Sequence, residues 1–230
     1  MTKKFCVIGL GYFGMNLALR LSELGAEVLA IDNHQDVIDK ISDKVAHAVC
    51  MNATDERALK SLGLKEMDAV IVAIGEGFES SIMTTAILQE IGVKNIYNRV
   101  TSPIHERLLR LMNVTEILVP EEIAAEQLAN RLMLPGVLNY YFITEEYGIF
   151  EIETPEKFYN KTLAQIQLRN KYNLNLITLK KLKKSRGLLS LGEHEEYEVV
   201  GVPKAELVLS EGTIMVIFGK EEDVKNLLNL

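Results

Sequence analysis

Several features are scarce in this sequence, and each scarcity excludes a class of protein. No apolar run in its 230 residues approaches the length of a membrane span, so we expect contact with a membrane only through a partner. The net charge of −7 argues against a nucleic-acid partner, because such surfaces work by neutralising phosphates. The two cysteines, Cys6 and Cys50, lack the spacing of a metal or redox site, and we expect both to be small buried hydrophobic residues.

Groups arranged for catalysis are scarce too. None of the four histidines lies in a nucleophile–base or metal-ligand pattern, and His105, just after Ser102 and Pro103, is expected in the first turn of a helix. A dehydrogenase brings a base and a cation over its nicotinamide, and residues 137–230 offer no compact set of this kind. The sequence therefore argues against an enzyme, with an NAD-dependent oxidoreductase kept as the alternative. A redox-sensing transcription regulator, a third hypothesis, is weakened by the acidic charge and by the lack of a separate DNA-binding domain.

What is present begins with an apolar strand, residues 5–8, that runs directly into a G-x-G-x-x-G motif. Gly9 allows a tight turn, Gly11 lets the backbone approach a phosphate, and Gly14 lets a helix pack close to the strand. A second apolar run ends at Asp32, whose carboxylate can accept hydrogen bonds from ribose hydroxyls and would repel a 2′-phosphate. The pattern predicts NAD or an adenosine nucleotide as ligand. The alternative for Asp32 is a solvated acid at the end of a strand.

Four further segments, at residues 47–50, 68–73, 94–99 and 116–119, are expected to be strands and are separated by helical patterns. Continuous apolar runs are typical of strands covered on both faces, so residues 1–120 predict an α/β, Rossmann-like fold with a doubly wound parallel sheet of six strands. Such sheets bind ligands outside the carboxyl ends of their strands. The residues expected at this site are Gly9, Gly11, Tyr12, Phe13, Gly14, Asp32, Asn52, Ala53, Thr54, Ala73, Ile74, Gly75 and Arg99.

Three of these residues have a second interpretation. Asn52 and Thr54 either bond to the edge of a base or cap the helical pattern that follows them. Arg99, the one cation at a strand end in this half of the sequence, either meets a phosphate or forms a surface salt bridge. The first strand follows Met1 too closely for a signal peptide, and we expect a cytoplasmic location.

A helical pattern at residues 121–136 links the two halves of the sequence, and Pro135 and Gly136 end it. Its apolar stripe, which either covers the helix's own sheet or crosses to a second subunit, consists of Ile123, Ala124, Leu128 and Leu132.

Residues 137–230 predict a small α+β domain. We expect a hairpin from strands 140–143 and 149–152 with its turn around Tyr147 and Gly148, a helix over 162–171, strands over 174–182 and 213–218, and a final helix from Glu221. A basic run at residues 180–187 suits a solvated hairpin loop, with an anion or membrane-surface contact as the alternative.

Several short motifs follow one another in a definite order along the chain. They are the glycine motif, Asp32, Asn52-Ala53-Thr54-Asp55, Val72-Ala73-Ile74-Gly75, Ser102-Pro103-Ile104-His105 and Val119-Pro120-Glu121. In this order, and over its whole length, the chain resembles the RCK proteins, the KtrA/TrkA-type cytoplasmic regulatory subunits of potassium uptake systems. The resemblance implies that no reaction is catalysed. It implies that ATP, ADP or NAD(H) binds in the Rossmann cleft and changes the shape of a homo-oligomeric ring, usually an octamer assembled from dimers, docked beneath a membrane potassium channel subunit.

Three positions acquire a role only through this resemblance. Tyr12 stands where similar proteins carry an arginine that reaches phosphate, so Arg99 is left as the basic phosphate contact and the discrimination of ATP from ADP stays open. Glu121 resembles an acid implicated in divalent-cation binding between paired subunits, with a solvated first-turn glutamate as the alternative. Arg169 lies in a stretch similar to a cyclic di-AMP site at a dimer interface, although residues 190–203 are longer and more acidic than the usual link.

Overall fold

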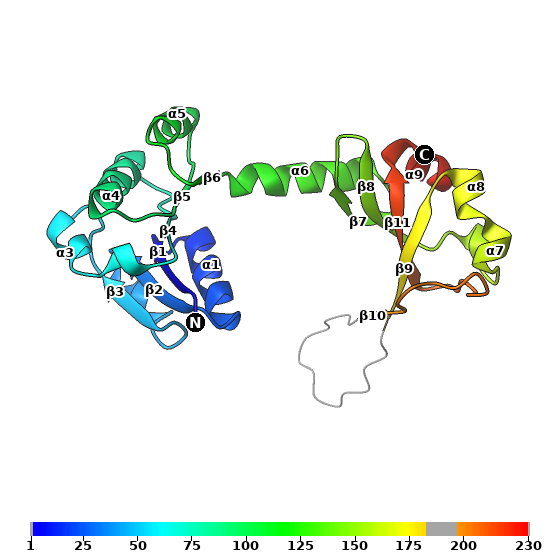
Figure 1. Cartoon of the computed structure of the whole chain (residues 1–230), viewed down its shortest axis with the longest axis horizontal. Coiled ribbons are helices and arrows are strands. Elements are labelled where there is room, and N and C mark those ends of the chain that lie inside the picture. The colour runs from blue at the N-terminus through cyan, green and yellow to red at the C-terminus, as the bar shows by residue number, and fades with distance from the viewer. Residues whose placement is uncertain (1, 183–196, 230) are drawn as a thin grey trace. The chain divides into compact units, whose positions relative to one another are not determined.

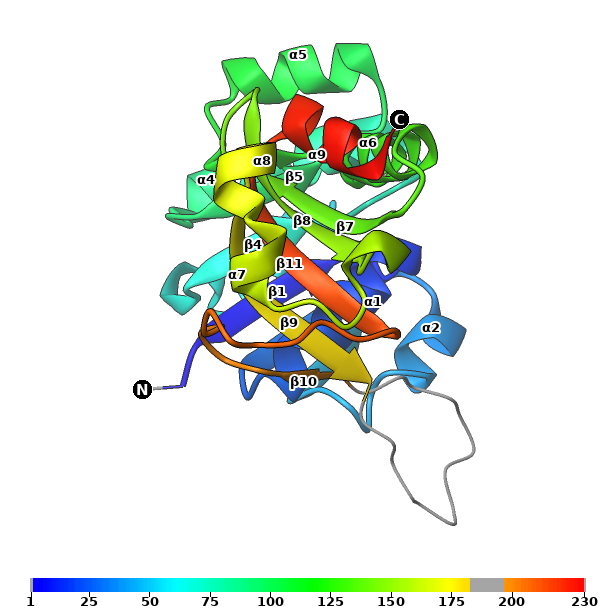
Figure 2. The same ribbon diagram turned by 90° about the vertical axis from the view of Figure 1, so that its right-hand side faces the viewer.

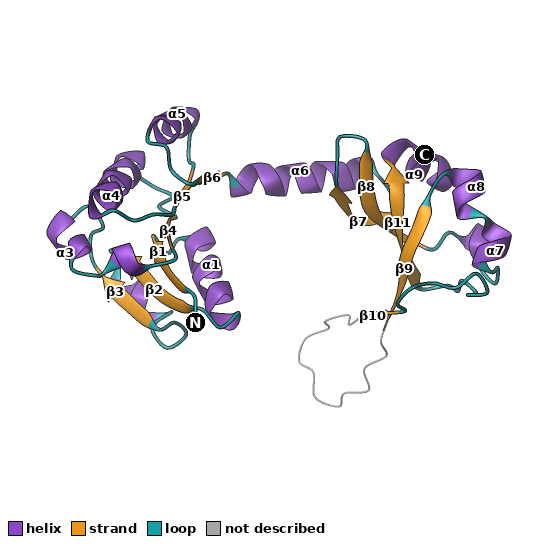
Figure 3. Ribbon diagram, in the orientation of Figure 1, coloured by secondary structure: helices purple, strands orange, loops and turns teal. Residues whose placement is uncertain are grey.

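The computed structural model describes residues 2–182 and 197–229, which form two compact units divided between Ala124 and Ala125. The first unit alternates strands with helices, and the second is built around an antiparallel sheet (Figures 1 and 3). The predicted fold class, a Rossmann-like doubly wound sheet followed by a small α+β part, is therefore confirmed. Among the described helices, none is both long enough and apolar enough to cross a bilayer.

The first unit contains a parallel sheet of six strands in the order β3-β2-β1-β4-β5-β6. The strands are β1 (Lys4–Ile8), β2 (Glu27–Asp32), β3 (His47–Cys50), β4 (Ala69–Val72), β5 (Ile96–Arg99) and β6 (Glu116–Leu118). The connecting helices are α1 (Tyr12–Glu23), α2 (Gln35–Asp39), α3 (Glu56–Lys60), the 3₁₀ turn η1 (Leu64–Glu66), α4 (Phe78–Ile91) and α5 (Pro103–Leu111). The strand order reverses at β1, the place where doubly wound sheets bind ligands.

Both faces of this sheet are covered, which explains why β1, β2 and β4 are apolar over most of their length. Cys6 and Ile8 of β1 pack into a core that includes Leu88 of α4. Val7, which points to the other face, packs into a second core with Ala18 of α1. Residues that alternate along one strand are thus buried on opposite faces of the sheet.

The two cysteines have different environments. Cys6 is buried as expected, and its burial raises the pKa of the thiol above its ordinary value. Cys50 is exposed, so the expectation that it is buried was wrong. It ends β3, which is an edge strand of the sheet, and an edge strand has a neighbour on one side only.

Helix α6 (Pro120–Met133) follows the first sheet, and none of its residues is buried. The expected apolar stripe is present on it, with Ile123, Leu128 and Leu132 all exposed. The helix therefore does not bury its stripe on the sheet that precedes it, which was one of the two predicted arrangements.

The second unit contains an antiparallel sheet of five strands in the order β10-β9-β11-β8-β7. The strands are β7 (Val137–Phe142), β8 (Tyr147–Glu153), β9 (Asn175–Leu182), β10 (Tyr197–Val199) and β11 (Thr213–Lys220). The helical segments are the 3₁₀ turn η2 (Glu156–Phe158), α7 (Leu163–Ile166), α8 (Leu168–Tyr172) and α9 (Glu221–Leu228). Strands β8, β11 and β9 lie side by side in both views (Figures 1 and 2), and their core includes Phe150, Leu179 and Ile217 with Leu227 of α9.

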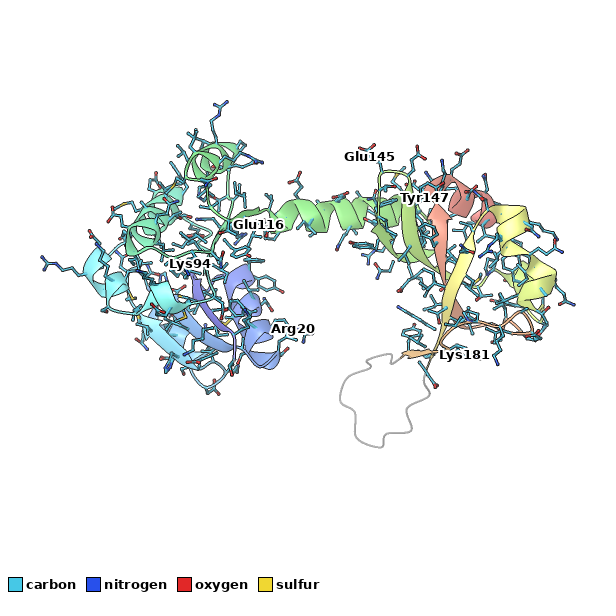
Figure 4. The ribbon with its side chains drawn as sticks, viewed as in Figure 1. Arg20, Lys94, Glu116, Glu145, Tyr147 and Lys181 are labelled. Atoms are coloured by element: carbon cyan, nitrogen blue, oxygen red, sulfur yellow. The ribbon has the colours of Figure 1, made fainter. Side chains whose placement is uncertain are left out.

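The predicted hairpin is present, but its turn lies earlier than expected. The backbone turns between Phe142 and Tyr147, and Tyr147 already pairs with Lys220 of β11. The Thr144 hydroxyl accepts a hydrogen bond of 3.1 Å from the Tyr147 backbone N–H and so stabilises this turn. Figure 4 shows Glu145 at the loop and Tyr147 where β8 begins.

The predicted helix over 162–171 is two short helices. Gln167 between them has a φ of +54°, a left-handed conformation that ends α7 and starts α8 in a new direction. The basic run at 180–187 was expected in a loop, but Lys180 lies inside β9, where it forms an ion pair with Glu151. Residues 183–187 of that run, and residues 190–196 of the long acidic stretch, lie outside the described residues.

Candidate functional site

The glycine motif forms a tight connection between β1 and α1. Gly9 has a φ of +90°, and a Cβ atom there would lie 2.9 Å from the backbone nitrogen of Ile74. A Cβ atom on Gly14 would lie 1.9 Å from the carbonyl oxygen of Gly9. A Cβ atom on Gly11 would meet nothing within 4 Å. Gly9 and Gly14 are thus required by the fold, whereas Gly11 faces open space.

The N-terminus of α1 lies at this connection. The N-cap residue is Gly11, which provides no side-chain cap, and the first turn contains no acidic residue. The first backbone N–H groups of a helix have no partner within the helix, and together with the helix dipole they attract an anion. The arrangement therefore suits a phosphate group.

Asp32 at the end of β2 is tied to the glycine motif. One carboxylate oxygen accepts a hydrogen bond of 2.7 Å from the Leu10 backbone N–H. The other accepts one of 2.9 Å from the His34 backbone N–H and lies 3.1 Å from the His34 ring nitrogen Nδ1. The side chain is only 11% exposed, which differs from the solvated acid considered as its alternative.

Asn52 and Thr54 lie beyond β3, and neither caps the helix that follows. The Asn52 side-chain oxygen accepts hydrogen bonds from the backbone N–H and the hydroxyl of Thr54, at 3.0 and 2.9 Å. Helix α3 is instead capped by Asp55, whose carboxylate accepts from the N–H groups of Arg57 and Ala58. The capping role considered for Asn52 and Thr54 therefore belongs to Asp55.

Arg99 at the end of β5 is the most constrained cation of the site. Its guanidinium forms an ion pair with Glu121 in the first turn of α6 and lies 5.8 Å from the centre of the Phe13 ring. A Cβ atom on Gly75 would lie 3.1 Å from one of its Nη atoms. The side chain is 18% exposed, and its Nε has no hydrogen-bond partner among the described residues.

Glu121 carries the charge that opposes Arg99. Its own backbone N–H and, next, the Arg99 guanidinium hold the pKa of the Glu121 carboxyl below its ordinary value. No cluster of three or more His, Cys, Asp and Glu side chains suited to a metal ion occurs in the part of the chain that the structure describes. In one chain Glu121 thus faces a cation, and the predicted divalent-cation site would need ligands from elsewhere.

A cavity of about 670 Å³ lies at the carboxyl ends of the strands and collects most of the predicted residues. The predicted residues that line it are Gly9, Gly11, Tyr12, Asp32, Asn52, Ala53, Thr54, Ile74, Gly75 and Arg99. Phe13, Gly14 and Ala73 are not among its lining residues, and they act through the packing of the loop and helix. Tyr12 is 91% exposed, although it lines this cavity.

The lining residues that were not predicted from the sequence include three polar ones on the β4–β5 side: Glu76, Ser80 and Thr84. They come from the loop after β4 and from α4. The run Val72-Ala73-Ile74-Gly75 marked where this loop begins, but which face of α4 meets the cavity depends on how that helix packs.

A buried polar cluster fixes α4 against β5. The Ser81 hydroxyl donates to the Asn98 side-chain oxygen at 2.9 Å, and the Asn98 amide donates to the Thr85 hydroxyl at 2.5 Å. The Thr85 hydroxyl donates in turn to the Ser81 carbonyl at 2.7 Å. All three side chains are fully buried, and Asn98 directly precedes Arg99, so the cluster holds the strand that presents the arginine.

His105 lies in the first turn of α5, as the sequence predicts. Its backbone N–H donates to the hydroxyl of Ser102, the N-cap residue, at 3.2 Å. The ring is fully buried, its Nε2 has no hydrogen-bond partner among the described residues, and burial lowers the pKa of the imidazole. Burial therefore favours the neutral form of this histidine.

A second, smaller cavity of about 370 Å³ surrounds Arg169 in the other unit. The Arg169 Nε and one Nη donate to the side-chain oxygen of Asn175 at 2.9 and 2.6 Å. Asn175 was not predicted from the sequence. The cavity also has apolar walls, made by Leu163, Leu168, Leu174 and Leu176.

Comparison with known proteins gives consistent results. The TrkA-N domain model matches residues 5–120. Ktr system potassium uptake protein C of Bacillus subtilis (strain 168) is 35% identical over 224 residues, covering 97% of this chain and 95% of the relative. Ktr system potassium uptake protein A of the same organism is 32% identical over 227 residues, covering 99% and 96%.

Solved structures share the fold. The GsuK RCK domain matches with a TM-score of 0.61 at 18% identity, and the GsuK channel bound to NAD with 0.58 at 17%. Each match covers 100% of this chain, which spans 48% of the first structure's chain and 39% of the second's.

Proposed function

The chain belongs to the TrkA-N family and is homologous to the Ktr system potassium uptake proteins over nearly its full length, and we propose that it is a nucleotide-binding regulatory subunit of a Ktr/Trk-type potassium uptake system. The observation that carries the proposal is the cavity, where the uncapped N-terminus of α1, Asp32 and Arg99 meet. These groups suit the phosphates and ribose of ATP, ADP or NAD(H). The NAD-bound GsuK channel, which shares the fold, supports the same ligand class.

Calorimetric titration tests the nucleotide site. The full chain is titrated with ATP, ADP, NAD⁺ and NADH, and we expect at least one of them to bind. Asp32→Ala and Arg99→Ala should weaken that binding, whereas Asp68→Ala and Arg110→Ala, which remove charges outside the cavity, should not. Binding of none of the four nucleotides, or unchanged affinity in both site variants, contradicts the proposal.

The proposed function is regulation without catalysis. Binding energy from the nucleotide would change the shape of a homo-oligomer, and that shape would gate a membrane potassium channel subunit. The protein would then act in the cytoplasm, held at the inner face of the membrane by this partner. An NAD-dependent oxidoreductase is the alternative, and substrate-dependent turnover of NADH would favour it.

The exposed stripe of α6 is the surface that we propose for pairing of subunits. Ile123, Leu128 and Leu132 lie on it without cover in the described chain. Replacing Leu128 and Leu132 by Ser should shift the protein from dimers and rings, an octamer in the simplest case, toward monomers in light scattering. Replacing the exposed Glu126 by Ser on the same helix is the matched control. If the molecular mass in solution is unchanged, this surface does not pair the subunits.

A second ligand, cyclic di-AMP, is proposed for the cavity around Arg169. Such a ligand needs a cation near its phosphates and apolar surface for its bases, and Arg169 and the leucines of this cavity supply both chemistries. We expect Arg169→Gln to abolish calorimetric binding of cyclic di-AMP and Lys171→Gln to retain it. Equal binding in wild type and in Arg169→Gln would exclude this site.

A further inference from the structure

The cavity of the first unit is lined by two groups of residues with the glycine motif between them. Asp32 and Asn52 follow β2 and β3 on one side, while Gly75 and Arg99 come from β4 and β5 on the other. The strand order β3-β2-β1-β4-β5 places the end of β1, where Gly9 begins the motif, in the middle. A ligand with phosphates at the N-terminus of α1 can therefore extend in both directions, with ribose and base near Asp32.

On the β4–β5 side, Thr84 has an unsatisfied hydroxyl. The residue is fully buried, lines the cavity, and its Oγ1 has no hydrogen-bond partner among the described residues. The next residue, Thr85, satisfies its hydroxyl by donating to the Ser81 carbonyl one turn earlier. Thr84 makes no such bond, so its hydroxyl is free to bond a polar group in the cavity. A buried hydroxyl of this kind is costly to leave unpaired, and a ligand that bonds to it gains affinity.

Arg99 offers a second free donor on the same side. Its Nε is buried without a partner in the described residues, while the guanidinium is already in an ion pair with Glu121. A free donor on an arginine whose charge is already balanced suits a neutral acceptor, such as a carbonyl or a hydroxyl, better than it suits another phosphate.

The charges around the cavity also favour a neutral group over a further phosphate on this side. Its acidic lining residues are Asp32 and Glu76, and Arg99 is the only Lys or Arg that the described chain contributes to the lining. Tyr12, at the edge, adds no charge. Two phosphates have the N-terminus of α1 to meet them, but apart from Arg99 and His34 the described lining holds no basic side chain for a third.

We infer, on the basis of the proposed nucleotide site, that Thr84 and Arg99 bind the carboxamide-bearing half of a dinucleotide, and that this chain therefore selects NAD(H) over ATP and ADP. A carboxamide both donates and accepts hydrogen bonds, so it can pair with the Thr84 hydroxyl and the Arg99 Nε–H. The ring and ribose of that half bring no phosphate beyond the two at α1.

The wild-type protein tests the selection directly. The full chain is titrated calorimetrically with NAD⁺, NADH, ADP-ribose, ADP and ATP. ADP-ribose keeps both riboses and both phosphates and lacks only the carboxamide ring. We expect NAD⁺ or NADH to bind about tenfold more tightly than ADP-ribose and than ATP, as the loss of one or two good hydrogen bonds implies. ATP binding as tightly as the dinucleotides overturns the inference and leaves the proposed function intact.

Thr84→Val tests the residue. The substitution keeps the shape of the side chain and removes the hydroxyl, and we expect it to weaken binding of NAD⁺ and NADH about fivefold while leaving the affinity for ADP unchanged. Thr154→Val is the control, because Thr154 is a buried threonine that lies in the second unit and does not line the cavity, so the ratio of NAD⁺ to ADP affinity should stay at its wild-type value.

Equal weakening of NAD⁺ and ADP by Thr84→Val contradicts the assigned role. If either variant fails to fold, the wild-type comparison of NAD⁺ with ADP-ribose still decides. Binding of none of these nucleotides would overturn the proposed function itself, together with this inference.

Discussion

Arg99 and Glu121 form an ion pair that joins the end of β5 to the first turn of α6. One member lines the nucleotide cavity and the other lies on the helix that leaves the first unit. A ligand that attracts Arg99 therefore competes directly with α6 for the same guanidinium. In this way an event in the cavity would reach a helix whose apolar stripe is exposed.

Glu121→Gln should change the ligand preference. Without the carboxylate, the positive charge of Arg99 is unbalanced, so we expect ADP and ATP to bind about threefold more tightly, with a smaller gain for NAD⁺. The gain should shrink as salt is added, because salt screens the guanidinium. Calorimetry at low and at moderate ionic strength measures both effects.

Glu122→Gln is the matched control, since Glu122 lies in the same turn and no ion pair of the described chain includes it. A gain of the same size in both variants would mean that net charge alone is responsible. If Mg²⁺ strengthens nucleotide binding to the wild type and loses that effect in Glu121→Gln, the predicted divalent-cation role of Glu121 gains support.

Gly14→Ala and Gly11→Ala should separate folding from binding. The Cβ of Gly14→Ala would overlap the Gly9 carbonyl, so we expect the free energy of unfolding to fall by about 3 kcal/mol. The Cβ of Gly11→Ala meets open space, and the stability should change little. That methyl group projects where a phosphate would lie, so nucleotide affinity should fall.

Thermal unfolding measures the first effect and nucleotide titration the second. If Gly11→Ala binds nucleotide as tightly as wild type, the phosphates do not bind at the N-terminus of α1. A Gly14→Ala protein of wild-type stability would contradict the packing described for the glycine motif.

His105 should make the fold sensitive to mild acid. Burial lowers its pKa in the folded state, so below the unfolded value of about 6.5 the unfolded chain binds a proton that the folded chain does not. The free energy of unfolding should therefore decrease as the pH is lowered from 7 toward 5, and we expect His105 to contribute to this loss.

His105→Asn keeps an acceptor near the Thr101 backbone N–H, which lies 3.3 Å from the ring nitrogen Nδ1, and it removes the titration. Denaturant unfolding at several pH values should show a flatter dependence in this variant. His47→Asn removes an exposed histidine and should leave the wild-type slope unchanged. Equal slopes in wild type and His105→Asn would show that another group is responsible.

Thr84→Val and Thr85→Val should have opposite effects on the ligand-free protein. Thr84 loses a hydroxyl that had no partner, so its variant should be as stable as wild type or slightly more stable. Thr85→Val breaks two hydrogen bonds of the buried cluster, which should cost about 2 kcal/mol. Denaturant unfolding of both proteins measures the difference, and a loss of stability in Thr84→Val would indicate that its hydroxyl has a partner in the free protein.

The sequence predicts the first unit well because its signals are local. A strand buried on both faces is continuously apolar, and the glycine motif has a fixed spacing, so β1, β2 and β4 and the residues at their ends are visible without a structure. The second unit is harder to predict. The break at Gln167 has no glycine or proline to mark it, and Tyr197–Val199 of β10, which was not predicted, is exposed along its length and owes its strand to pairing with β9.

The residues of the site also differ in how well the sequence predicts them. Asp32 and Arg99 lie at the ends of strands, so the predicted strands are enough to locate them. Thr84 is one of several hydroxyl residues on α4, and only the rotation of that helix about its axis sends Thr85 into the buried cluster and Thr84 to the cavity. Asn175 was likewise missed, because its partner Arg169 is six residues away and the two meet only after the chain turns at Asn173.

The exposure of Cys50 provides a means of following the nucleotide cavity by chemical labelling. The sequence has two cysteines, and Cys6 is buried with a raised pKa, so a thiol-directed fluorophore should react with the native protein at Cys50 alone. Cys50 pairs in register with Asp32 and stands two positions before Asn52, both of which line the cavity. The sequence thus carries a single exposed thiol on a strand that leads to the cavity, and occupancy of the cavity could be followed optically without introducing a mutation.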